Sequence, residues 1–173
     1  MSTLLTIGHS VHEPDAFIAL LESNGVELLA DVRRHPGSRR VTWTNAGTIA
    51  DVLGAAGIGY LHFEALGGRR KPEQDSLNGG WRVGQFQGYA DHMRSDEFRA
   101  ALAQLEQEAT LRRSAVMCAE AQWWRCHRRL LADAMSMREW EVLHIMGKAE
   151  PNPHELTEFA VVESGELVYP PAA

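Results

Sequence analysis

The apolar run Leu4-Leu5-Thr6-Ile7-Gly8-His9-Ser10, which breaks off at a glycine and two polar residues, decides the fold. A run of this length predicts a short buried strand that ends in a polar loop. The next segment suits a helix, because Pro14 fits a first helical turn and apolar residues then recur at helical spacing. Gly25 fits the end of that helix, so the chain opens with a strand, a helix and a turn.

The same alternation continues along the chain. Further strands are predicted at residues 26–32, 58–63, 114–117 and 140–146, with helical segments between them. Thr44 and Ser95 are expected to cap two of these helices, and another helix is expected to begin within residues 122–126. This order predicts a doubly wound α/β fold with a mostly parallel sheet of about five strands. Residues 159–169 predict a small C-terminal hairpin.

The composition is typical of a single globular domain spanning residues 1–173, with 45% hydrophobic and 23% charged residues. No apolar run is long enough for a transmembrane helix, and the first residues lack the features of a secretory signal. We therefore expect a cytoplasmic protein with no membrane partner, in which Cys118 and Cys126 are both thiols. The formal net charge of −6 disfavours a general nucleic-acid binder.

Four predicted loops hold most of the polar side chains that could bind a ligand. In open parallel sheets, ligands bind beyond the carboxyl ends of the strands, which here selects residues 8–10, 33–43, 64–86 and 119–125. Fifteen of the 17 basic residues are arginines, and guanidinium groups and helix amino ends both favour anions. The loops therefore predict a phosphate or carboxylate site. The expected binding residues are His9, Ser10, Arg33, Arg34, Arg39, Gly67, Gly68, Trp81, Trp124 and Arg128.

Cys118 is the residue that most strongly suggests catalysis. A thiol at the end of a strand, near arginines and a helix amino end, lies where a thiolate nucleophile is stabilised. Glu120 or His127 is the expected proton partner, and Asp31 is expected to orient the arginines. The alternatives are that Cys118 and Cys126 are inert packing groups and that Asp31 only pairs with a local arginine.

Two more specific chemistries fit the cysteines less well. The signature of cysteine phosphatases needs an arginine where this chain has Trp124, and Arg125 comes one residue late. A metal site would lack the close Cys-x-x-Cys pairing of structural zinc sites. We therefore predict neither a phosphatase nor a metal or other cofactor. The residues that the metal alternative would use are Cys118, Cys126, His127 and either His9 or Asp31.

The long polar segment at residues 64–86 predicts a lid over the site. Its glycines allow unusual backbone conformations, and Trp81 could close over a planar group. The alternative is a solvated connector. The Trp123-Trp124 pair has three interpretations, namely a stacking platform, part of the core or a dimer contact, so a homodimer is left open.

Short blocks spread along the chain resemble the DUF488 family, whose members are named for having no assigned function. The resemblance implies a Rossmann-like α/β fold and no established reaction. This chain is similar to the branch with tryptophans between the Cys-Ala-Glu and Cys-His-Arg blocks. The blocks that carry the resemblance are Thr6-Ile7-Gly8-His9-Ser10, Asp31-Val32-Arg33-Arg34, Leu66-Gly67-Gly68, Gly88-Tyr89-Ala90, Cys118-Ala119-Glu120, Cys126-His127-Arg128 and His144-Ile145.

Taken together, these features predict a small enzyme that applies a strand-end cysteine to an anionic, phosphate-like or nucleotide-like substrate. Cys118 is expected to act as the nucleophile or as an acid and base, while Arg33, Arg34 and Arg128 hold the anion. The alternative is a non-catalytic module that senses a nucleotide or single-stranded nucleic acid through arginines and stacked tryptophans.

Overall fold

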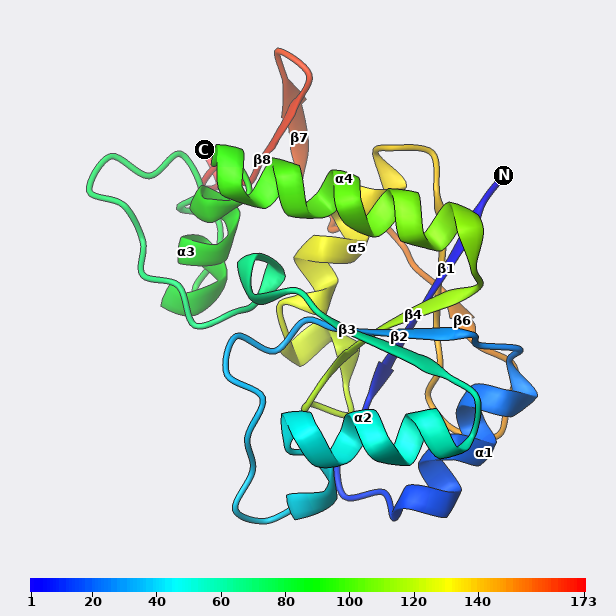
Figure 1. Cartoon of the computed structure of the whole chain (residues 1–173). Coiled ribbons are helices and arrows are strands. Elements are labelled where there is room, and N and C mark those ends of the chain that lie inside the picture. The colour runs from blue at the N-terminus through cyan, green and yellow to red at the C-terminus, as the bar shows by residue number, and fades with distance from the viewer.

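A computed structural model describes all 173 residues, and strands alternate with helices along most of its length (Figure 1). The helices are α1 (Pro14–Ser23), α2 (Ala46–Ala55), α3 (Gly84–His92), α4 (Asp96–Leu111) and α5 (Arg128–Ser136). The strands are β1 (Thr3–Gly8), β2 (Leu28–Asp31), β3 (Gly59–His62), β4 (Ser114–Cys118), β5 (Glu141–His144), β6 (Asn152–Pro153), β7 (Val161–Glu163) and β8 (Glu166–Val168). Three 3-10 turns complete the set: η1 (Thr42–Thr44), η2 (Glu64–Leu66) and η3 (Trp123–Arg125).

The main sheet has six strands in the order β3-β2-β4-β1-β5-β6. The first five are parallel, and the two-residue β6 pairs antiparallel with β5 at the edge. β7 and β8 form a separate antiparallel hairpin. The predicted α/β fold, its parallel sheet and its C-terminal hairpin are therefore confirmed, and the arrangement is Rossmann-like. β6 was not predicted, because two residues that include Pro153 carry no strand signal.

The sheet is covered by helices on both faces, as Figure 1 shows. Successive side chains of a strand point to opposite faces, and β1 illustrates the result. Leu5 and Ile7 belong to a core cluster that includes residues of α1 and α2. Leu4 belongs to the larger cluster, which includes residues of α3, α4 and α5. This two-sided burial explains why the central strands read as continuous apolar runs.

Two predicted helix starts need correction. α2 begins after Asn45, because Thr44 ends the turn η1, where its hydroxyl donates a hydrogen bond to the carbonyl of Val41 at 2.7 Å. α5 begins at Arg128, later than residues 122–126, because η3 comes first and Cys126 has an extended backbone. Ser95 caps α4 as predicted and accepts a hydrogen bond from the amide of Phe98.

The prediction that residues 64–86 form a lid closed by Trp81 is not supported by the structure. The Trp81 ring is 7% exposed and packs edge-on or tilted against Phe86, Phe159 and Tyr169. Its position is in the larger core cluster, outside the cavity described below. The glycines and arginines around it suggested a mobile loop, whereas two of the three aromatic partners that bury it, Phe159 and Tyr169, lie far away in the sequence. None of the helices is both long and apolar enough to cross a membrane.

The carboxyl ends of β1 and β4 are held unusually close together at the centre of the sheet. The chain leaves β1 toward α1 on one face and leaves β4 toward α5 on the other, which makes this point a topological switch. The amide of His9 donates to the carbonyl of Cys118 at 2.9 Å, which continues the parallel ladder beyond both strands. A Cβ atom on Gly8 would overlap the carbonyl of Glu120, so only glycine lets the two loops approach in this way.

We expect Gly8→Ala to lower the free energy of unfolding by about 1–3 kcal/mol, because the added methyl group must push the Glu120 carbonyl away. Chemical denaturation measures the change. Gly54→Ala is the matched control, since a Cβ there meets nothing within 4 Å and alanine is the better helix former, by up to about 1 kcal/mol. Equal stabilities of Gly8→Ala and wild type would show that the close approach is not a constraint.

Candidate active site at the strand ends

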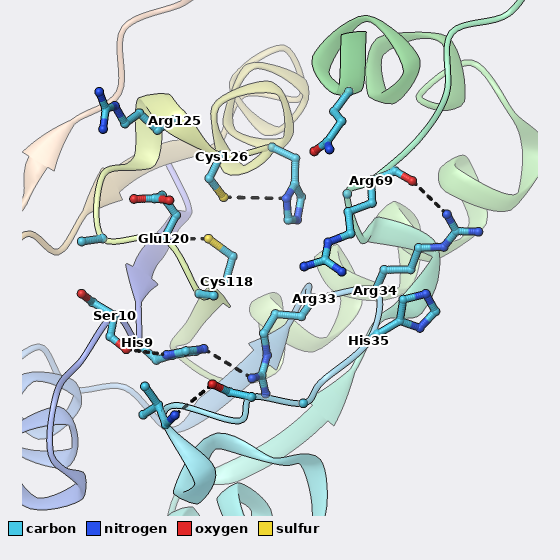
Figure 2. A pocket seen from close by; sticks show the side chains of 18 of the residues that line it. His9, Ser10, Arg33, Arg34, His35, Arg69, Cys118, Glu120, Arg125 and Cys126 are labelled. Carbon is cyan, nitrogen blue, oxygen red and sulfur yellow. Dashed lines mark hydrogen bonds between the residues drawn. The ribbon is translucent and has the colours of Figure 1, made fainter. Parts of the chain in front are cut away.

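A cavity of about 550 Å³ lies beyond the carboxyl ends of the strands (Figure 2). The predicted residues that line it are His9, Ser10, Arg33, Arg34, Gly68, Cys118, Glu120 and His127. Those that do not line it are Asp31, Arg39, Gly67, Trp81, Trp124 and Arg128. The structure thus brings residues from all four loops together, while six of the predicted residues lie behind the cavity wall or elsewhere.

The lining of the cavity is strongly basic although the whole chain carries a formal net charge of −6. Five arginines contribute to it and only one carboxylate, that of Glu120, so the formal balance is 5 − 1 = +4 with neutral histidines. Such a lining favours an anion through charge and through many N–H donors. The arginines are Arg33, Arg34, Arg40, Arg69 and Arg125.

Asp31 holds Arg33 in a fixed orientation at the end of β2. The Nε and one Nη of Arg33 donate to the two carboxylate oxygens of Asp31 at 2.9 and 2.7 Å, and Tyr60 donates its hydroxyl proton to the same carboxylate at 2.6 Å. Asp31 is fully buried, so it has no access to a ligand. Asp31 therefore positions Arg33 and does not transfer protons to a ligand.

His9 is a neutral histidine that faces the held guanidinium. Its Nδ1 lies 2.9 Å from the carbonyl of Ser10, which requires the proton on Nδ1. The unprotonated Nε2 then accepts from Arg33 at 3.4 Å. Burial lowers the pKa of His9 and the positive charge of Arg33 adds to this, against the opposing hydrogen bond to Ser10. The cavity therefore gains no positive charge from His9 near pH 7.

A fully buried guanidinium, that of Arg128, lies behind the cavity wall. Its Nε donates to the sulfur of Cys118 at 3.0 Å, and its Nη atoms donate to the hydroxyl of Thr6 and to the carbonyls of Glu120 and Ala121. It makes no ion pair with a carboxylate. A buried charge without a counter-charge is costly, and the neighbouring groups able to carry a negative charge are the two thiols.

The two thiols differ in acidity, and the more acidic one is Cys126. Burial alone would raise the pKa of Cys126, but the adjacent Cys118 and the charge and N–H groups of Arg128 lower it to about 7. Its sulfur accepts the backbone amide of Arg128 at 3.3 Å, at the start of α5. Burial and the adjacent Cys126 raise the pKa of Cys118. These directions favour Cys126, which sequence reasoning treated as packing, as the thiolate, while the Cys118 thiol donates to the carbonyl of Glu120 at 3.7 Å and its sulfur accepts the Nε of Arg128.

His127 is placed to take a proton from Cys126. Its Nε2 lies 2.7 Å from the carbonyl of Val32 and must carry the ring proton, which leaves Nδ1 free as an acceptor 3.7 Å from the Cys126 sulfur (Figure 2). Burial lowers the pKa of His127. A Cβ on Gly68 would lie 2.8 Å from that Nδ1, so glycine here leaves room for the imidazole. Glu120, the other predicted proton partner, contacts Cys118 through its carbonyl only.

A chain of buried side chains extends from Arg128 into the protein. Thr6 lies 2.6 Å from Nδ1 of His144, whose Nε2 lies 3.0 Å from Nδ1 of His154, whose Nε2 lies 2.7 Å from Asp133. Because Arg128 only donates and an ionised Asp133 only accepts, every proton in this chain is directed toward Asp133. Burial above all, and the positive charge of Arg128, lower the pKa of His144 to about 3, which keeps it neutral.

The tryptophan pair supports this chain instead of lining the cavity. The Trp123 ring stacks on His144 with centroids 4.2 Å apart and planes at 4°. Trp124 packs edge-on against Trp123 and is 42% exposed. Arg39 is exposed and outside the cavity, and Gly67 packs against the backbone of Arg34. No group of three or more His, Cys, Asp or Glu side chains is arranged to hold a metal ion.

The parallel sheet, the switch point and the strand-end cavity place the chain among Rossmann-like α/β proteins. The family model described as "Domain of unknown function DUF488" matches residues 13–135, and the chain belongs to that family. The match includes both cysteines, although β1 and the residues from β5 onward lie outside it. No curated protein and no solved structure matches the chain.

We expect Arg128→Met to raise the pKa of Cys126 from about 7 toward the ordinary cysteine value of about 8.5, because it removes the cation that stabilises the thiolate. The rate of iodoacetamide alkylation against pH, with the labelled cysteine identified by mass spectrometry, measures the change. Arg138→Met is the control, since Arg138 is an arginine paired with Glu106 on the surface.

Arg128→Lys keeps the positive charge but loses the planar guanidinium with its several N–H donors. The pH midpoint of Cys126 alkylation in this variant is therefore expected between those of wild type and Arg128→Met. This variant also carries the test if Arg128→Met fails to fold. Midpoints equal to wild type in Arg128→Lys and in any folded Arg128→Met protein would contradict the assignment of Arg128 as the counter-charge.

Proposed function

We propose that the protein is an enzyme that binds an anionic, phosphate-like or nucleotide-like substrate in the strand-end cavity and attacks it with a cysteine thiolate. The observation that carries this proposal is the buried Arg128, which has no carboxylate partner and contacts two thiols of unequal acidity. Both thiols line a cavity with five arginines. A nucleophile and an anion-binding surface therefore share one space, as thiol-dependent group transfer requires.

The reaction uses groups already in contact. His127 Nδ1 takes the proton from the Cys126 thiol, and the sulfur then attacks the electrophilic atom of the substrate. A bond forms between sulfur and that atom, while the leaving group departs with its electron pair and receives the proton from His127. The cavity arginines, with Arg33 held by Asp31, bind the anionic part. The charge of Arg128 and its backbone amide, which donates to the Cys126 sulfur at 3.3 Å, keep the Cys126 thiolate available at neutral pH.

The alternative of a non-catalytic nucleotide sensor finds less support. Stacking of a base needs an aromatic platform beside the arginines. Trp81 is in the core and Trp124 lies outside the cavity, so neither predicted platform is available. Phe86 is the one phenylalanine, tyrosine or tryptophan that lines the cavity.

The test of catalysis is covalent trapping with a panel of activated phosphate esters, acyl phosphates and nucleotides. At least one member is expected to give an adduct on Cys126, followed by turnover. Cys126→Ser is expected to lose at least about 100-fold in rate, because an alcohol is far less ionised than this thiol. Intact-mass spectrometry and release of the leaving group are the measurements.

Cys118→Ser is the matched variant. It keeps the nucleophile but replaces the neighbouring sulfur that accepts the Nε of Arg128, so a smaller loss of rate than in Cys126→Ser is expected. Tight binding of panel members with no adduct and no turnover would instead favour the sensor. Turnover that survives in Cys126→Ser would refute the assigned nucleophile.

A further inference from the structure

A second cavity opens directly beside the thiol cavity. It measures about 450 Å³ and shares Arg34 and Arg69 with the first, so the two cavities adjoin at these residues, and the pair of cavities is called the trough below. Arg70 and Lys71 extend the basic lining beyond the shared pair. None of the nine residues that line the second cavity is hydrophobic. It is therefore suited to a charged group, whereas the thiol cavity also has apolar walls.

The basic side chains of the second cavity have no carboxylate partners. Arg34, Arg69, Arg70 and Lys71 make no ion pair, and the arginines that do are mostly on other surfaces, for example Arg94, Arg99, Arg112 and Arg138. After burial, the charge of Arg34 is the main cause that lowers the pKa of Arg70, so these cations repel one another. A bound anion would remove that repulsion.

The guanidinium groups are held by backbone carbonyls, which leaves other N–H groups free. Arg34 donates one Nη to the carbonyl of Arg69 at 3.0 Å, while its buried Nε has no partner (Figure 2). Arg70 donates to the carbonyls of Gly67 and Glu64, both at 3.2 Å. Neutral carbonyls fix these groups in place without cancelling their charge.

The backbone that carries Arg70 and Lys71 is fixed against α3. A Cβ on Gly88 would overlap the carbonyl of Arg70, so α3 and this loop are in direct backbone contact. The carboxylate of Asp91 accepts the amide of Glu73 at 2.8 Å and further hydrogen bonds from Ser76 and Asn78. Asp91 is one of two acids at this cavity, and its carboxylate oxygens are already occupied by hydrogen bonds within the protein. The site is preformed, which lowers the entropic cost of binding.

We infer that the trough binds a chain of two or more linked phosphates, with the reacting end beside the thiols and the following phosphates in the second cavity. This inference rests on the proposed function, because the first anion must occupy the thiol cavity. Arg34 and Arg69 contact the junction between the two positions. Arg70 and Lys71 contact only the distal phosphates and set the preference for a longer chain.

The experiment measures how well inorganic phosphate, pyrophosphate and tripolyphosphate protect Cys126 from alkylation. Ionic strength is held constant, because salt screens exposed charges. All three are expected to protect wild type, with an apparent Kd at least about tenfold lower for tripolyphosphate than for phosphate. We call this tenfold difference in Kd the chain-length gain. In the double variant Arg70→Gln/Lys71→Gln the chain-length gain should disappear, while the Kd for phosphate stays unchanged.

Two control variants separate this site from general charge effects. Arg82→Gln removes an exposed arginine from the same segment, outside both cavities, and should keep the full gain. Arg125→Gln changes the first cavity only, so it should raise the apparent Kd for phosphate and for tripolyphosphate by the same factor. The inference would be overturned if Arg82→Gln lost the chain-length gain, or if the double variant Arg70→Gln/Lys71→Gln kept it.

Failures of the two proposals are distinguishable. If inorganic phosphate does not protect Cys126 at all, the proposed function fails at its anion site. If phosphate protects Cys126 but longer phosphate chains bind no more tightly, only the role assigned to the second cavity is wrong. Adenosine triphosphate that protects better than tripolyphosphate identifies a nucleotide as the source of the phosphate chain. A short oligothymidylate that protects better than both would assign the trough to a nucleic-acid strand and refute the linked phosphates.

Discussion

The structure depends on one buried cation. Arg128 is fully buried at the start of α5 and is bound by groups from three different segments: Thr6 in β1, Cys118 at the end of β4, and the carbonyls of the loop after β4. Removing a guanidinium from water is tolerated only when every contact is well placed. The same contacts therefore align β1, β4 and α5 and leave a thiolate as the natural counter-charge. The stability of the sheet centre and the reactivity of the thiols have a common origin.

The hydrogen-bond chain behind Arg128 orients groups and does not conduct protons. A guanidinium does not release a proton in proteins, so nothing can pass from the thiols through Arg128 to Thr6 and the histidines. This hydrogen-bond chain orients its members, because each proton is donated toward Asp133 and each histidine ring is fixed in one tautomer. Stacking of Trp123 on His144 adds a wall that excludes water. Asp133 and Arg128 are thus a separated pair of buried charges joined by aligned dipoles.

The sequence allowed the fold to be predicted, and it pointed to the strand ends where the structure has a cavity, because both follow from local signals. Apolar runs that end at glycine or charge mark strands, and the carboxyl ends of parallel strands meet at one edge. The sequence favoured Cys118 over Cys126 as the nucleophile, because it could not show that the backbone amide of Arg128 contacts Cys126 while its Nε contacts Cys118. Trp81 was misassigned because its burial is supplied by Phe159 and Tyr169, more than 70 positions away. The His144–His154–Asp133 contacts are likewise invisible to local patterns.

The uneven distribution of charge bears on the size of the ligand. The chain carries a formal net charge of −6, yet the thiol cavity has a formal balance of +4. At physiological salt, charges interact strongly only within about 8 Å. A short anion inside the trough meets the arginines and is screened from the acidic remainder of the protein. At the far side of the trough, two acids, Glu73 and Asp91, line the second cavity beside its basic side chains. The placement of the arginines within the trough therefore supports the proposal of a short anionic ligand beside the thiols.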